Sequence, residues 1–298
     1  MSRFAQYAWG VLGYNILVVL WGAYVRASGS GAGCGEHWPT CNGEVLPRAA
    51  SIETMIEFTH RLTSGLALLL TIGLVIAAVR LYPTGSRVRK AAWTTLGFMI
   101  AEALLGAGLV IFGLVADDDS VARALVICAH LINTLALLGF MALTAWWSDR
   151  PGRLNLNQPE ARWFSISISG VFLIGVTGAI AALGDTLFPA TSLAEGLAAD
   201  MEPGAHFLLK LRGFHPVLAI LVGTGLLYLG KHLRSQKDLS VLATALMGLV
   251  GIQIIVGFTN LALLAPIYLQ LIHLLLADAV WIVLVVLGAS TLEMRRAE

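Results

Sequence analysis

Residues 56–79 read IEFTHRLTSGLALLLTIGLVIAAV, a mainly apolar run with a glutamate and a histidine near its beginning. A helix of about 20 apolar residues spans the hydrocarbon core of a bilayer, which is roughly 30 Å thick. The run therefore predicts a membrane-spanning helix. Seven further runs meet the same criterion, and the eight predicted spans are 7–26, 56–79, 91–115, 123–147, 162–183, 208–230, 241–264 and 267–289.

The composition agrees with a chain that lies in lipid. Of its 298 residues, 57% are hydrophobic and 12% are charged, against roughly 25% charged residues in ordinary globular proteins. This excludes a disordered chain, a coiled coil and most soluble enzymes. The formal net charge of +1 leaves no basic surplus for nucleic acid. We predict an all-α polytopic membrane protein.

The basic residues predict the orientation of the spans. The N-terminus, the tail and the loops after the second, fourth and sixth spans hold 13 of the 19 Lys and Arg residues. Cytoplasmic loops carry an excess of Lys and Arg. We therefore expect a multi-pass protein of the cell membrane with both termini in the cytoplasm.

The chain also shows a weak internal repeat. Its two longest outer loops, about 27–55 and 184–207, each follow the first helix of a group of four. Short matches support the repeat, such as Gly22-Ala23 with Gly178-Ala179. We predict two pseudo-symmetric four-helix bundles, residues 1–150 and 151–298.

Four of the seven histidines lie on even-numbered spans, each within about two turns of the outer end: His60, His130, His215 and His273. In an up-down-up-down bundle the second and fourth helices face each other diagonally. Each pair could therefore ligate one haem iron from both sides, since imidazole is a common axial ligand. Zinc is disfavoured because neither pair has nearby cysteine or carboxylate ligands. The alternative is histidines that only form hydrogen bonds within the bundle.

Four basic residues lie at the same outer level: Arg26, Arg61, Lys210 and Arg212. We consider them candidate partners for haem propionates. The alternative is ordinary extension of long basic side chains towards the membrane interface.

Acidic residues make the two histidine pairs unequal. Glu57 precedes His60 by three residues and shares its helix face, whereas Arg212 precedes His215. The pattern suggests one reaction site with an acid or base and one electron-transfer or structural site. The alternative is that Glu57 only complements the helix dipole.

Two deeper acids remain, Glu102 and Asp278, and we favour a hydrogen-bonding role for Glu102 over a proton route.

The outer loop CGEHWPTC, residues 34–41, contains two cysteines in a compartment that we expect to be oxidising. A disulfide between Cys34 and Cys41 is the natural interpretation. A metal site formed by both thiols and His37 is the alternative.

Taken together, these residues resemble the haem A synthase family over essentially the whole chain. The most specific segments are GAYVR at 22–26, SGAGC at 30–34, WPTC at 38–41 and EFTHR at 57–61. The resemblance implies an oxidoreductase that converts the C8 methyl of haem O to a formyl group by successive hydroxylations. Its product, haem A, would serve terminal oxidases.

The resemblance also assigns roles to particular residues. It implies that His60 and His130 hold the substrate haem, and that His215 and His273 hold a haem b cofactor. Glu57 would be the catalytic glutamate, with an acid/base or intermediate-stabilising role. The family's outer-loop cysteines match the pair in the 34–41 loop. A haem O synthase would be the donor of the substrate, and a terminal oxidase or its assembly factors the acceptor of the product.

Two other functions fit part of the pattern. A dihaem b-type cytochrome would pass electrons to or from a quinone and leave both haems unchanged. A transporter would use the repeats together with Glu102 and Asp278, and would bind no chromophore.

Overall fold

The computed structural model describes residues 1–48, 50–150 and 152–294. In these residues, eight helical segments are long and apolar enough to cross a membrane, which confirms the predicted all-α membrane fold. Seven are single helices: α1 (Arg3–Ala27), α2 (Ile52–Leu81), α3 (Arg87–Ile111), α4 (Val121–Ser148), α5 (Glu160–Leu187), α9 (Ser240–Ala262) and α10 (Ile267–Thr291).

The sixth span consists of two helices, α7 (Phe207–Arg212) and α8 (Phe214–Leu233), which meet at Gly213. The predicted span 208–230 covers most of both helices and gives no sign of the break between them. Pro216 is tolerated because it lies in the first turn of α8, where backbone N–H groups have no partner within the helix.

Serine side chains begin each of the first four spans. Ser2, Ser51, Ser86 and Ser120 each accept a hydrogen bond from the backbone N–H three residues later. This is the usual N-cap arrangement, which satisfies an otherwise unpaired donor at the helix start. The first four helices therefore begin where the sequence supplies a cap.

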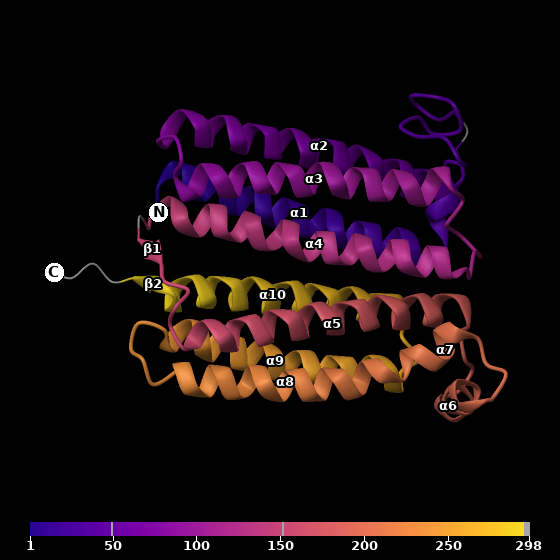
Figure 1. The fold of residues 1–298 in the computed structure, drawn as a ribbon. Helices are drawn as coiled ribbons and strands as arrows, with labels where there is room; N and C mark the ends of the chain where they lie inside the picture. Colours follow the sequence, from indigo (N-terminus) through magenta and orange to yellow (C-terminus); the bar gives the residue numbers. More distant parts are fainter. Residues whose placement is uncertain (49, 151, 295–298) are drawn as a thin grey trace.

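Figure 1 shows the eight spans side by side, with α1–α4 forming one group and α5, α8, α9 and α10 the other. Within each group every helix packs against the next, and the last packs against the first. As a result α2 lies diagonally across from α4, and α8 lies diagonally across from α10. The division of the chain into two domains at residue 150 stays a prediction.

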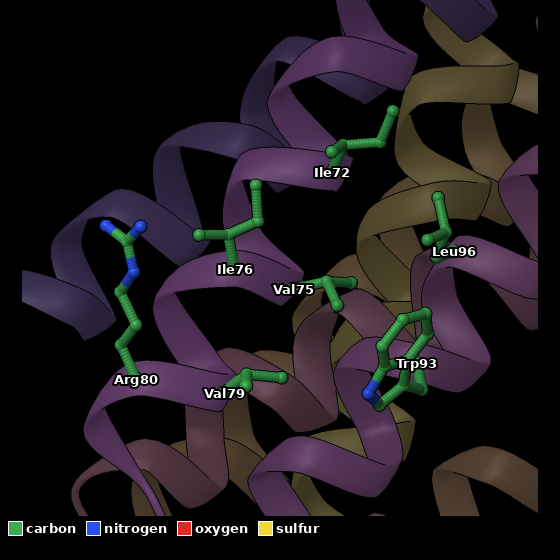
Figure 2. A pocket seen from close by; sticks show the side chains of 7 residues that line it. All are labelled: Ile72, Val75, Ile76, Val79, Arg80, Trp93 and Leu96. Atoms are coloured by element: carbon green, nitrogen blue, oxygen red, sulfur yellow. The ribbon is translucent and has the colours of Figure 1, made fainter.

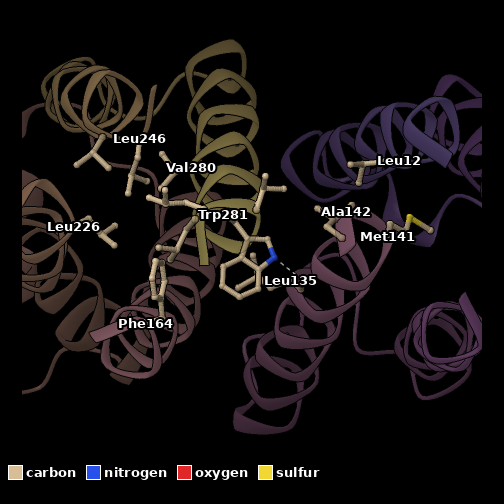
Figure 3. Close-up of a cluster of buried hydrophobic side chains, with 14 of the residues drawn as sticks. Leu12, Leu135, Met141, Ala142, Phe164, Leu226, Leu246, Val280 and Trp281 are labelled. Carbon is tan, nitrogen blue, oxygen red and sulfur yellow. Dashed lines mark hydrogen bonds between the residues drawn. The ribbon is translucent and has the colours of Figure 1, made fainter. Parts of the chain in front are cut away.

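The two groups meet through α1 and α4 on one side and α5 and α10 on the other. Trp281 of α10 is buried there, and its indole N–H donates to the carbonyl of Leu135 in α4 at 2.6 Å (Figure 3). Phe172 of α5 packs edge-on against the same indole, with ring centroids 5.4 Å apart. A single aromatic side chain thus joins three helices across the interface.

The two ends of the bundle differ. At one end lie the N-terminus and a short pairing of β1 (Arg153–Leu154) with β2 (Glu293–Met294) (Figure 1). At the other end lie the loop that contains η1 (Ser30–Ala32) and the short helix α6 (Leu193–Met201). His60, His130, His215 and His273 all lie towards this second end.

Candidate functional site

Each histidine of the two predicted pairs, His60, His130, His215 and His273, lies against a glycine of a neighbouring helix. At three of these glycines a Cβ atom would come within about 3 Å of the imidazole Cε1: 2.9 Å for Gly22 with His60, 3.0 Å for Gly178 with His215, and 2.9 Å for Gly257 with His273. At Gly106 it would lie 3.7 Å from Nε2 of His130. Only glycine leaves room for three of these rings, and the same contact occurs twice in each half of the chain.

The second-half pair has the spacing of two ligands on one metal. The ring centroids of His215 and His273 are 6.3 Å apart, and the ring planes are 86° to each other. Two imidazoles that ligate one ion from opposite sides place their centroids roughly 6 Å apart, given metal–nitrogen bonds of about 2 Å. Thr177 Oγ1 lies 3.2 Å from Nδ1 of His215. Nε2 of that ring is therefore the nitrogen left for a ligand.

The first-half pair carries a carboxylate. His60 and His130 stand on the diagonally opposed helices α2 and α4, and Nδ1 of His130 lies 3.0 Å from Oε1 of Glu102. The ring N–H does not point straight at this oxygen, so the contact is close without being an aligned hydrogen bond. Nδ1 of His60 is buried and has no hydrogen-bond partner.

These features are compatible with a haem held between the histidines of each pair. Buried ring nitrogens without aligned partners occur at His60, His130 and His273, although buried polar atoms are normally paired. No group of three or more His, Cys, Asp or Glu side chains able to hold a metal ion occurs in the described residues. A tetrahedral zinc site therefore does not fit, whereas two axial imidazoles from facing helices fit a planar iron macrocycle.

Glu57 is buried, with 3% of its surface exposed, and both its oxygens are engaged. Oε2 accepts from the backbone N–H of Cys34 at 2.8 Å, and Oε1 accepts from Nε of Arg61 at 3.1 Å. The carboxylate therefore joins α2 to the outer loop one helical turn from His60. The i, i+4 spacing of Glu57 and Arg61 makes their pairing readable from sequence, but the backbone contact to Cys34 is not.

The outer loop is closed by a disulfide between Cys34 and Cys41, whose Cα atoms are 4.4 Å apart. Both cysteines are fully buried. Nη1 of Arg61 donates to the carbonyls of His37 at 2.6 Å and Thr40 at 2.5 Å. The loop is therefore fixed over the N-terminal end of α2.

Arg26 extends from the first half of the chain into the second. Its guanidinium donates to the Ala182 carbonyl at 2.7 Å, to Thr186 Oγ1 at 2.5 Å and to Gln270 Oε1 at 2.8 Å. Gln270 precedes His273 by one helical turn. Sequence reasoning missed these partners because they lie more than 150 residues away in the chain.

Arg212 and Lys210, the remaining two candidate partners for haem propionates, also donate hydrogen bonds to other residues of the protein. Arg212 donates to Asp200 at 2.8 Å and to Asp185 at 3.1 Å. Lys210 donates to the carbonyl of Pro203 at 2.8 Å. These contacts fasten α6 and its flanking loop to the start of the sixth span.

An apolar groove lies away from these residues. It occupies about 260 Å³ between α2 and α3 and is lined by Ile72, Val75, Ile76, Val79, Arg80, Trp93 and Leu96 (Figure 2). Twelve residues separate His60 from Ile72, which is roughly 18 Å along a helix. The groove offers no histidine or carboxylate, so we place no chemistry there.

The fold and the histidines define a class: a multi-pass helical membrane protein with a facing histidine pair in each half. Comparison with known proteins then gives the family. The family model COX15-CtaA, cytochrome oxidase assembly protein, matches residues 5–285. The chain belongs to this family, which is the haem A synthase family that its sequence resembles.

Several relatives are similar to the chain over different lengths. Heme A synthase of Bacillus mycoides is 42% identical over 114 residues, covering 38% of this chain and 37% of that protein. Protoheme IX farnesyltransferase of Thermus thermophilus is 50% identical over 297 residues, covering 98% of this chain and 49% of that protein. A second strain of the same species has a relative of the same name that is 49% identical. The chain thus spans about half the length of the Thermus proteins.

Proposed function

We propose that this chain is a haem A synthase, an oxidoreductase that converts the C8 methyl of haem O to a formyl group. Family membership and the relatives named heme A synthase support the proposal. The observation that carries it is the four histidines set against glycines, because these residues would supply two pairs of imidazoles able to hold haem iron.

The two pairs take different roles in this proposal. His60 and His130 hold the substrate haem, and His215 and His273 hold a haem b cofactor. Haem bound at these residues supplies the redox chemistry. The protein's histidines hold and orient each macrocycle, and the surrounding apolar helices keep bulk water away from it.

Glu57 is the proposed catalytic residue. Arg61 and the Cys34 amide hold its carboxylate in one orientation, one helical turn from His60. Such a fixed group at the outer edge of the substrate site can exchange a proton or stabilise an intermediate. Arg61 donates hydrogen bonds to Glu57 and to the loop carbonyls, so its main role is to position this carboxylate.

The substrate and its supply follow from the same proposal. Haem O carries a farnesyl-derived tail. The Thermus relatives, which match 98% of this chain, are named protoheme IX farnesyltransferase. We infer that a haem O synthase delivers the substrate to this chain within the membrane. Haem A then passes to a terminal oxidase or its assembly factors, in line with the family's description.

The basic-residue pattern supports a cell-membrane location with both termini in the cytoplasm. In this orientation the histidine pairs, the disulfide loop and α6 lie towards the outer side. Labelling of single cysteines placed in the C-terminal tail and in α6 tests the orientation. The tail cysteine should react with a membrane-impermeant maleimide only after the cells are opened.

The decisive experiment is analysis of haem extracted from cells that co-express this chain with a haem O synthase. The wild type should yield haem A, and Glu57→Ala should yield only haem O or partly oxidised haem. Glu53→Ala is the matched control, because Glu53 is an exposed acid one turn earlier on the same helix. That variant should yield haem A as the wild type does.

A second variant separates chemistry from loop anchoring. Glu57→Gln keeps an acceptor for the Cys34 amide but removes the titratable group. Absence of haem A in this variant supports an acid/base role, whereas normal output means that Glu57 only anchors the loop. Protohaem and unconverted haem O in the wild type would instead favour a dihaem b-type cytochrome.

A further inference from the structure

A second carboxylate lies closer to a histidine of the first-half pair than Glu57 does. Glu102, on α3, places Oε1 3.0 Å from Nδ1 of His130 on α4. The same carboxylate accepts from Thr134 Oγ1 at 2.5 Å and from Asn133 Nδ2 at 2.5 Å. Three polar residues on one face of α4 therefore surround Glu102 and fix its position.

In the described residues of the second half, no carboxylate forms an ion pair with His215 or His273. Gln253 on α9 occupies the place that corresponds to Glu102, four residues before the glycine that faces a histidine. Its amide nitrogen lies 3.3 Å from Nε2 of His273, whereas Glu102 faces Nδ1 of His130, and its amide oxygen has no hydrogen-bond partner. Nδ1 of His273 is buried without a partner and is the nitrogen left for a ligand. Leu276 and Ala277 stand where the first half has Asn133 and Thr134. The anionic network thus belongs to the first-half site alone.

A carboxylate beside the second ring nitrogen of a ligating histidine changes the electronic properties of the metal ion that the ring binds. It fixes the ring tautomer and makes the ligating nitrogen more basic. A more basic ligand favours the oxidised, more positive iron and so lowers its reduction potential.

We propose that Glu102 is a positioning residue that acts through His130 and makes the first-half haem more electron-rich than the second-half haem. The inference rests on the proposed function, because it requires haem at both histidine pairs. Among the sequence differences between the two sites, the replacement of Glu102 by Gln253 removes the charge next to the histidine ring and so gives the sites different potentials. The electron-rich site is then the one that holds the substrate.

The test is a spectroelectrochemical redox titration of the purified full-length protein loaded with haem at both sites. Glu102→Gln should raise one of the two midpoint potentials and leave the other unchanged, with two haems still bound per chain. Glu102→Asp, which keeps the charge, should restore the lower potential at least in part. A residue that only packed the helices would not produce this charge-dependent pattern.

The reciprocal variant tests the same inference by adding a carboxylate to the second-half site. Gln253→Glu should lower the potential of the other haem, and it does not depend on whether Glu102→Gln folds. Two unchanged potentials in both variants would overturn the inference while leaving the proposed function intact. Wild-type protein that binds no haem would refute the proposed function itself, and the inference with it.

Discussion

Adding one methyl group at Gly22 should selectively impair the first-half haem site. A Cβ at this position would lie 2.9 Å from Cε1 and 3.1 Å from Nε2 of His60, and ordinary contact begins at 3.4 Å. The ring must therefore retreat by about 0.5 Å or leave its rotamer. Overpacking of this kind costs about 1–3 kcal/mol. That cost corresponds to a loss of affinity of about 5- to 150-fold.

The assay is haem titration of purified Gly22→Ala, with the bound haems identified by extraction and chromatography. We expect weakened binding of the haem at the His60 pair and normal binding at the His215 pair. Gly13→Ala is the matched control, because it adds the same methyl group to the same helix with nothing within 4 Å. Gly178→Ala should give the opposite result, since its Cβ would lie 3.0 Å from His215.

The reasoning fails if Gly22→Ala binds both haems as tightly as Gly13→Ala does. It also fails if Gly22→Ala and Gly178→Ala weaken the same haem, because the two glycines contact histidines of different pairs. Circular dichroism of each variant confirms that the helices are intact. A loss of haem with native helix content is then attributable to the displaced imidazole.

Three further perturbations test other contacts. Trp281→Phe removes the hydrogen bond to a buried carbonyl between the two halves, so it should lower the free energy of unfolding in detergent by about 1–2 kcal/mol without changing haem content. Arg26→Met removes three hydrogen bonds to the second half, including the one to Gln270; the two halves should then melt in separate calorimetric transitions. Cys41→Ser frees the loop that Arg61 fixes, and haem extracts should contain less haem A but as much haem b.

The spans were predictable from sequence because each depends on a local property, the length of an apolar run. The expected span 162–183 corresponds to α5 at Glu160–Leu187, and the expected span 267–289 to α10 at Ile267–Thr291. The break at Gly213 was less visible, because α7 and α8 together still form one continuous apolar segment. Helix ends depend on capping and tertiary contacts, which hydropathy does not record.

The candidate site was predictable only in part. The depth of the histidines follows from their positions along the spans, and the glycines could be found by aligning the repeats. The partners of Arg26 and Glu102 could not be read in this way, because they lie on other helices, up to 244 residues away. Which side chains meet across a bundle depends on helix rotation, and the sequence pattern leaves that angle open within the width of an apolar face.

At one corresponding position the two halves of the chain hold residues of opposite charge, and both residues anchor a neighbouring segment. Three residues before the first histidine of each pair stand Glu57 and Arg212. Glu57 binds the Cys34 amide of one outer loop, and Arg212 binds Asp200 beside the other. The repeated helical arrangement therefore anchors a loop in each half. It places a carboxylate near the His60 pair and a guanidinium near the His215 pair. A carboxylate can exchange a proton near neutral pH, whereas a guanidinium stays protonated, so this exchange of charge favours the first half as the site of chemistry.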